Sequence, residues 1–204
     1  MSIKKIISTI KKYKTFLITS HINPEGDALG SELSFFMLLK KLGKEAYIIN
    51  ADLTPLEYYF LPGVANIKHL KGRLKDLDFD CFVILDSSDL RRCGEVARLS
   101  KGKLVMNIDH HISNEIFGGV NLVETEASSC SEIIYRLYKD MGVPLDKDVA
   151  ELLYVGIMTD TGSFRYSNTT GRTHEIAADL IKYGLDVSRL YKHAYGSVPF
   201  EDMK

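Results

Sequence analysis

A strand, a loop and a helix that follow one another near the amino terminus decide the fold. Residues 16 to 43 read FLITSHINPEGDALGSELSFFMLLKKLG. Phe16 to Ser20 has the length and apolar character of a strand. The segment from about Ala28 to Leu42 predicts a helix, which Gly43 ends. The loop between them, His21 to Asp27, is rich in groups that carry chemistry.

Strands and helices continue to alternate along the rest of the chain. Apolar runs predict strands at residues 46–50, 81–85 and 104–108. The expected helices are an amphipathic surface helix within 1–15, a short one led by Pro55, one that opens with the capping-box spacing Ser129 to Glu132, and others at about 146–158, 172–183 and 187–194. Such alternation favours parallel pairing through right-handed crossovers. We expect an α/β fold, doubly wound, with a mainly parallel sheet and helices on both faces.

The composition excludes several classes of function. With 26 Lys and Arg against 27 Asp and Glu, the formal charge of the 204 residues is -1, so no global basic field attracts long nucleic acid. No segment approaches the roughly 20 apolar residues of a membrane helix. Cys81, Cys93 and Cys130 form no C-x-x-C pair and leave one over, which argues against a disulfide framework and a thiolate zinc site. A reducing cytoplasm is the expected location.

Four acidic or histidine clusters are the main functional signal. They are His21 to Asp27, Asp86 to Asp89, Asp109 to His111 and Thr159 to Gly162, and all but the last follow an apolar stretch of strand length. Strand ends are where α/β proteins place their chemistry. If the strands share one sheet, the carboxylates and imidazoles meet at one edge, where the negative charge of the carboxylates requires cations. The sequence therefore predicts a site for several metal ions.

The first two clusters also have simpler explanations. An Asx-turn with a helix cap would account for Asp27, but not for His21 and Glu25 beside it. Asp86 could bridge two cations about 3.5 to 4 Å apart, or it could cap a helix. Asp89 is interpreted as a cap.

Asp109-His110-His111 is the sharpest of the four signals. One histidine could bind a metal while its neighbour faces a phosphate, with Asp109 orienting the metal-bound ring. The alternative is a pair of solvated surface histidines.

The last cluster combines a ligand with an anion contact. Asp160 is a candidate metal ligand, and Arg165 could clamp a phosphate or be an ordinary surface cation. The helix start at Gly30 and Ser31 could donate backbone N–H groups to an anion. Oxygen and imidazole ligands without thiolates suit Mn, Mg, Co, Fe or Zn. Two such ions at one site are typical of phosphoester or phosphoanhydride hydrolysis.

With its four motifs in order, the sequence resembles the DHH phosphoesterase superfamily, named for the motif that stands here as Asp109-His110-His111. The resemblance spans about Thr15 to Tyr195. It is nearest to the oligoribonuclease (nanoRNase) and pAp phosphatase branch, through residues 21–31, 114–121 and 159–170. It implies a Rossmann-like catalytic domain that hydrolyses short oligoribonucleotides, pAp or both.

The resemblance also implies roles for individual residues. It implies two divalent ions, foremost Mn, with Mg or Co as alternatives. The implied ligands are His21, Glu25 and Asp86 for one ion, and Asp27, Asp86, His110 and Asp160 for the other. His111, with Asp109, would contact the scissile phosphate and assist the leaving group, and Arg165, Ser31 and Asn168 would contact the substrate. The family usually has Asp where this chain has Glu25.

The resemblance divides the chain and leaves alternatives open. Residues 1–194 would be the catalytic domain, and 195–204 would begin a linker to a DHH-associated domain that this sequence does not contain. An inorganic pyrophosphatase or a cyclic-dinucleotide phosphodiesterase would use the same metal motifs, and a non-catalytic nucleotide-binding sensor is an alternative of another class. A dehydrogenase is rejected because no G-x-G-x-x-G follows a predicted strand. Partners would be short RNA or a nucleotide phosphate, without long nucleic acid or membrane, and a homodimer is left open.

Overall fold

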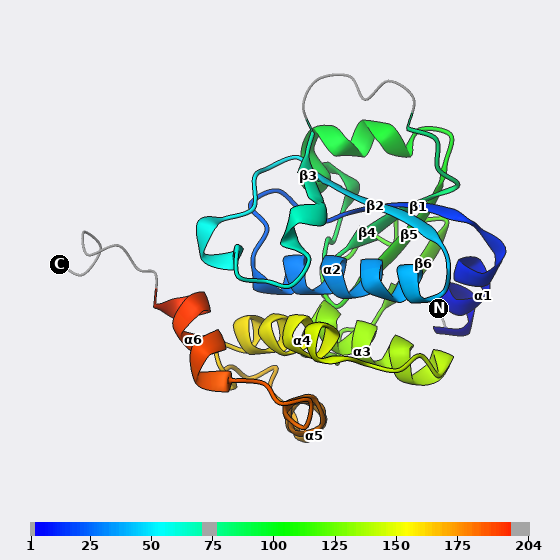
Figure 1. Ribbon diagram of the computed structural model, residues 1–204. Helices are drawn as coiled ribbons and strands as arrows, with labels where there is room; N and C mark the ends of the chain where they lie inside the picture. Colours follow the sequence, from blue (N-terminus) through cyan, green and yellow to red (C-terminus); the bar gives the residue numbers. More distant parts are fainter. Residues whose placement is uncertain (1–2, 71–76, 197–204) are drawn as a thin grey trace.

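The computed structural model describes residues 3–70 and 77–196, which form a parallel sheet with helices on one side and a 3-10 layer on the other (Figure 1). The strands are β1 (Thr15–Thr19), β2 (Glu45–Asn50), β3 (Ile67–His69), β4 (Cys81–Leu85), β5 (Leu104–Asp109) and β6 (Val120–Val123). Every described pairing is parallel, and the order is β3-β2-β1-β4-β5-β6. This is the strand order of doubly wound dinucleotide-binding folds, so the predicted fold class is confirmed.

Helices cover one face of this sheet. They are α1 (Ile3–Lys12), α2 (Gly26–Lys41), α3 (Cys130–Met141) and α4 (Lys147–Asp160), followed by α5 (Gly171–Ile181) and α6 (Val187–Tyr195). Figure 1 shows α2 next to the sheet, α4 packed against the side of α2 that faces away from the sheet, and α5 and α6 outside α4. The other face is covered by η3 (Leu90–Ser100), a 3-10 segment kinked at Gly94, where φ is +57°. Two shorter 3-10 segments, η1 (Leu56–Tyr58) and η2 (Val64–Asn66), lie between β2 and β3.

A separate apolar cluster fills each side of the sheet. The larger lies between the sheet and the α-helices, and the smaller lies under η3. Every residue of the central strand β4 is buried, as its uninterrupted apolar sequence predicts. Helices α2 and α4 approach closely because Gly30 has no side chain: a Cβ atom there would stand 2.5 Å from the Leu152 carbonyl oxygen. This contact fixes α2, whose first turn carries Asp27.

Local signals located the helices well and the edge strands poorly. Ser129 caps α3 by accepting from the Glu132 amide, but the Glu132 carboxylate binds Ser128 instead of completing the predicted capping box. The predicted amphipathic helix is α1, and its apolar face is packed on the core. The sequence did not predict β3 or β6, because strands of three and four residues are too short to show a periodic pattern.

The chain order places the candidate residues around one crevice. In this fold the order of strands reverses between β1 and β4, and ligands bind beyond the carboxyl ends of the strands at that point. His21 follows β1 and Asp86 follows β4 directly. Residues 197–204, most of the expected linker, lie outside the described residues.

Two further observations on the described residues concern membrane helices and cysteines. No helix among them is long and apolar enough to cross a membrane. Their three cysteines are all free and buried.

Candidate metal-binding site

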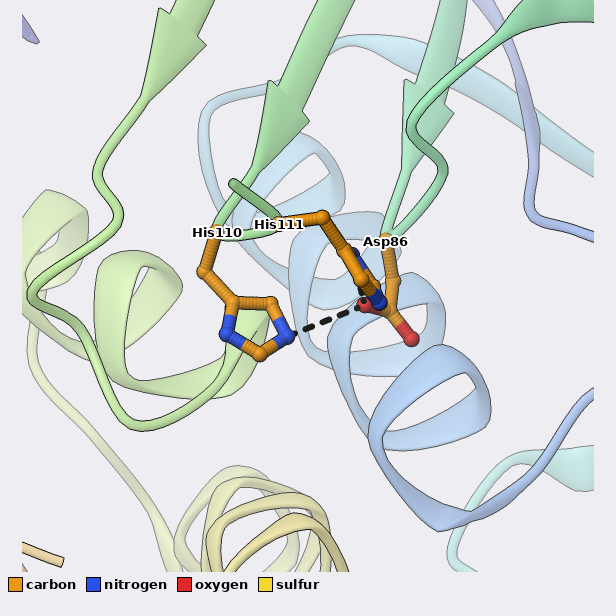
Figure 2. A group of neighbouring side chains, drawn as sticks. All are labelled: Asp86, His110 and His111. Atoms are coloured by element: carbon orange, nitrogen blue, oxygen red, sulfur yellow. Dashed lines mark ion pairs between the residues drawn. The ribbon is translucent and has the colours of Figure 1, made fainter. Parts of the chain in front are cut away.

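Asp86 stands at the centre of the candidate site. Its backbone is left-handed, with φ of +53°, a strained conformation that turns the carboxylate inward from the end of β4. One carboxylate oxygen lies 3.6 Å from Nε2 of His21, and the other lies 3.5 Å from Nε2 of His110 and 3.7 Å from Nδ1 of His111. Figure 2 shows the rings of His110 and His111 turned toward this carboxylate. A single buried acid therefore faces three imidazoles.

Two groups of three potential ligands share His110: the first is Asp86, His110 and His111, and the second is Asp27, His110 and Asp160. Asp27, His110 and Asp160 each place one ligand atom within 4.8 Å of the others. His110 Nε2 lies 3.5 Å from an Asp160 oxygen. The Asp27 oxygens accept hydrogen bonds of 2.6 and 2.9 Å from the amides of Cys130 and Ser131, at the amino end of α3. Helix α3 thus orients an acid that belongs to α2, more than a hundred residues earlier in the chain.

His21 presents a free ring nitrogen to Asp86. Its Nδ1 lies 2.7 Å from the carbonyl oxygen of Ile22, which can only accept, so Nδ1 carries the proton. Nε2 is then available to a cation. Glu25, the third ligand expected here, is exposed and belongs to neither group of three potential ligands. It forms the amino-terminal cap position of α2 without a side-chain hydrogen bond, and its charge is among the causes that raise the pKa of Asp160.

Asp109 orients a different histidine from the one we expected. It is fully buried, and one of its oxygens lies 2.7 Å from Nδ1 of His111. Its other oxygen accepts a 2.7 Å hydrogen bond from the Asn114 side chain. The hydrogen bond to Asp109 raises the pKa of His111 against the effect of burial. The expectation was that Asp109 would orient His110, the histidine implied as a metal ligand. In the structure Asp109 contacts His111 instead.

The three residues predicted to bind substrate differ in their surroundings. Asn168 donates to the backbone oxygens of Ser128 and Asp160, at 2.9 and 3.1 Å, and so holds the Asp160 loop in place. Arg165 is exposed, and its Nε donates to the Gly162 carbonyl oxygen at 2.7 Å. Ser31 is fully buried and donates to a carbonyl oxygen within α2. The structure does not support a substrate contact for Ser31, because the serine lies in the interface that α2 buries.

When no metal is bound, protons on Asp27, Asp160 and His110 reduce the negative charge of the site. Burial, together with the charges of Asp86 and Asp160, raises the pKa of Asp27 to about 8. Burial raises the pKa of Asp160 to about 6. Burial opposes protonation of His110, yet the nearby carboxylates of Asp86, Asp27 and Asp160 raise its pKa to about 10. Burial likewise opposes ionisation of Asp86, but the adjacent imidazoles of His110 and His21 lower its pKa.

These protons occupy the positions that divalent cations would take. Oδ1 of Asp86 and Nε2 of His110 are buried and have no hydrogen-bond partner in the structure. Buried polar atoms without partners are rare in native proteins and commonly indicate an ion. The donors are carboxylate oxygens and imidazole nitrogens, which Mn and related divalent metals accept. The residues present therefore fit a divalent metal centre, and metal binding would release the protons.

Two residues near the site could hardly be identified from the sequence. Asn114 fixes Asp109, and only its position within the resembling segment 114–121 drew attention to it. Arg92 is half-buried, and its carbonyl oxygen accepts a 2.7 Å hydrogen bond from the Ile22 amide, next to His21. The Arg92 guanidinium forms no ion pair among the described residues, whereas that of its neighbour Arg91 pairs with Asp89 and Glu115. Arg92 lies in the first turn of η3, and only the fold shows that this turn is beside the His21 loop.

Comparisons with known proteins agree with this geometry. Residues 15–157 match the DHH family, N-terminal domain. The chain is 32% identical over 196 residues to the bifunctional oligoribonuclease and PAP phosphatase NrnA of Bacillus subtilis, a match covering 94% of this chain and 60% of that protein. It is 35% identical to the Thermus thermophilus protein of the same name, covering 85% of this chain and 51% of that one.

A solved structure is also similar. It is that of an exopolyphosphatase-related protein from Bacteroides fragilis, with a TM-score of 0.88 and 29% identity. The match covers 96% of this chain and 60% of that one. The chain thus spans about half to three fifths of the length of these relatives.

Proposed function

The chain belongs to the DHH family, and from this premise we propose that it is a metal-dependent phosphoesterase that hydrolyses short oligoribonucleotides, pAp or both. The observation that carries the proposal is the sharing of ligands: Asp86 faces three imidazoles, and His110 belongs to both groups of potential ligands. Shared ligands hold cations close together, which is the arrangement that phosphoryl hydrolysis uses. The names of the relatives support the choice of substrate.

We propose two divalent ions, foremost Mn, with Mg or Co as alternatives. Asp86 and His21 would hold one ion, and Asp27, His110 and Asp160 would hold the other, with Asp86 between them. When bound, such ions supply an activated water and neutralise charge on the phosphoryl oxygens. The buried, unpartnered Asp86 and His110 atoms support this assignment.

His111 is the proposed acid. Asp109 holds the Nδ1 proton and raises the pKa of the ring, so the imidazole carries a proton more readily near neutral pH. Its other nitrogen, Nε2, can then donate to a phosphoryl oxygen. As the P–O bond to the leaving oxygen breaks, the same proton can pass to that oxygen, while the attacking water forms the new P–O bond and releases a proton to solvent. Asp109 is a positioning residue in this scheme.

The charge distribution favours a small anionic substrate. Arg92 beside His21, and Arg165 after Asp160, are the proposed phosphate contacts. The overall charge of -1 gives no attraction for long nucleic acid. The three free, buried cysteines support the proposal that the chain works in a reducing cytoplasm.

The proposal is tested by turnover of defined substrates with Mn. Purified chain is given pAp, the dinucleotide pApA, pyrophosphate or a cyclic dinucleotide, and product is measured for the native sequence and His111→Ala. His174→Ala is the matched control, since this exposed histidine lies outside both ligand groups. We expect pAp or pApA to be hydrolysed, with loss of turnover only in His111→Ala.

Other outcomes would contradict the proposal. Turnover of pyrophosphate or the cyclic dinucleotide alone would indicate the corresponding alternative enzyme. Nucleotide binding without hydrolysis, unchanged in His111→Ala, would indicate a sensor.

A further inference from the structure

A small cavity lies beside the candidate site, at the carboxyl ends of β2 and β3. Its volume is about 190 Å³, and its walls come from the segment after β2, from η2 and from the last residue of β3, His69. All six strands are parallel, so this cavity opens at the same edge of the sheet as the metal ligands. None of its lining residues belongs to the groups of potential ligands.

A direct contact joins the cavity to the loop that carries the ligands. Asp52 lines the cavity, and its carboxylate accepts a 2.8 Å hydrogen bond from the amide of Asn23, two residues after His21. The order β2-β1-β4 puts two strand spacings, roughly 10 Å, between the end of β2 and the end of β4, where Asp86 stands. A ligand whose phosphate is at Asp86 could therefore place a second group, one sugar away, in this cavity.

The cavity has the size and lining of a site for a single base. Pockets that enclose a whole drug-sized ligand measure roughly 300 to 1,000 Å³, so this smaller one suits one ring system. Leu53, Val64 and Ile67 form apolar walls, and Tyr59 adds an aromatic ring that is 55% exposed. Bases stack on such rings without regard to their sequence.

Two polar side chains in the cavity wall, His69 and Thr54, are available to the polar edge of a base. His69 lines the cavity, and its Nδ1 is buried with no hydrogen-bond partner among the residues that the structure describes. Thr54, also in the wall, makes no side-chain hydrogen bond among the described residues. A buried nitrogen without a partner is costly and is satisfied when a ligand supplies one. The edge of a purine or pyrimidine offers both donors and acceptors.

We propose that this cavity binds the nucleobase of the nucleotide whose phosphate is cleaved. Tyr59 stacks on the base, and His69 with Thr54 contacts its polar edge. The proposal rests on the proposed function for the identity of the substrate. Base binding itself requires no turnover, so the two are tested separately.

The experiment compares two ligands that differ only in the base. AMP and ribose 5-phosphate are titrated into the full chain with Mg, and dissociation constants are measured by calorimetry. We expect AMP to bind more tightly, and we expect Tyr59→Ala to weaken AMP binding at least about 5-fold. Binding of ribose 5-phosphate should change by less than about twofold. Tyr59→Phe, which keeps the ring, should behave like the native chain.

Two further variants complete the design. Tyr47→Ala removes another partly exposed tyrosine outside the cavity and should leave AMP binding unchanged. His69→Ala is the second test of the cavity if Tyr59→Ala does not fold. Equal binding of AMP and ribose 5-phosphate would overturn the proposal, as would native AMP affinity in the folded cavity variants. If pAp is not hydrolysed but the preference for AMP persists, the proposed function fails and the base site stands.

Discussion

Glu32 provides a quantitative test of how the interior near the site is built. It lies on α2, is fully buried, and accepts a 2.9 Å hydrogen bond from the Asn50 side chain with one oxygen. The other oxygen has no hydrogen-bond partner, and neither does the buried hydroxyl of Ser20. Burial raises the pKa of Glu32 from its ordinary value of 4.5 to about 7. The substitution to test is Glu32→Gln, which keeps the acceptor for Asn50 and adds a donor.

The sign and size of the effect follow from proton linkage. Below pH 4.5 the carboxyl is protonated in both the folded and unfolded states, so it carries no penalty. Between pH 4.5 and 7 the unfolded chain releases the proton and the folded protein retains it, so stability falls as pH rises. The shift of about two and a half pH units, at about 1.4 kcal/mol each, removes about 3 kcal/mol from the free energy of unfolding above pH 7. Glutamine has no such penalty.

Urea denaturation with EDTA present measures this free energy at pH 5 and pH 8. We expect the stability gained by Glu32→Gln to increase by about 2 kcal/mol from pH 5 to pH 8. Glu45→Gln, at an exposed position on β2, is the control for removing one carboxylate. A gain for Glu32→Gln that is equal at the two pH values would refute the reasoning, because it would mean that burial does not perturb Glu32.

Three further predictions concern the site and its supports. Asp109→Asn removes a charged hydrogen bond to His111, so the pKa of His111 in an NMR titration should fall. The value of kcat/KM should fall about 10- to 100-fold. An unchanged His111 titration would contradict the positioning role of Asp109. Gly156→Ala places a Cβ 2.8 Å from an Asp27 oxygen and should cost about 1 to 3 kcal/mol in thermal unfolding. Gly171→Ala, where the space is open, should be neutral, and equal melting temperatures for the two variants would argue against this packing. Mn at about 100 times its dissociation constant should add about 2.7 kcal/mol of stability over EDTA; identical melting curves would count against the metal centre.

Much of the site could be predicted because its signals are local. The apolar runs before His21, Asp86 and Asp109 indicated strands, and a parallel sheet gathers the carboxyl ends of its strands at one edge. The meeting of these groups therefore followed from the element pattern. Arg92 could not be found in the same way, since no local pattern shows that the start of a 3-10 segment packs against the His21 loop.

Contacts between distant segments determined the individual pairings. The amides of Cys130 and Ser131 orient Asp27, and no local pattern connects α3 with α2. The direction in which the Asp86 side chain points depends on its left-handed backbone conformation, which neighbouring residues must hold in place. Such choices are made by packing, and packing is known only when the whole chain is in place.

The sequence by itself determined the alternation of strands and helices apart from the short strands β3 and β6, the Ser129 cap of α3, and the presence of acids and imidazoles where strands end. These depend on interactions within a few residues, which a linear pattern records. Tertiary structure alone decided that Asp109 holds His111, that Glu25 lies outside the ligand groups, and that His110 is shared by both. The reason is directional: a side chain points where its backbone dihedral angles and its neighbours allow, and both are set by segments far away in the chain.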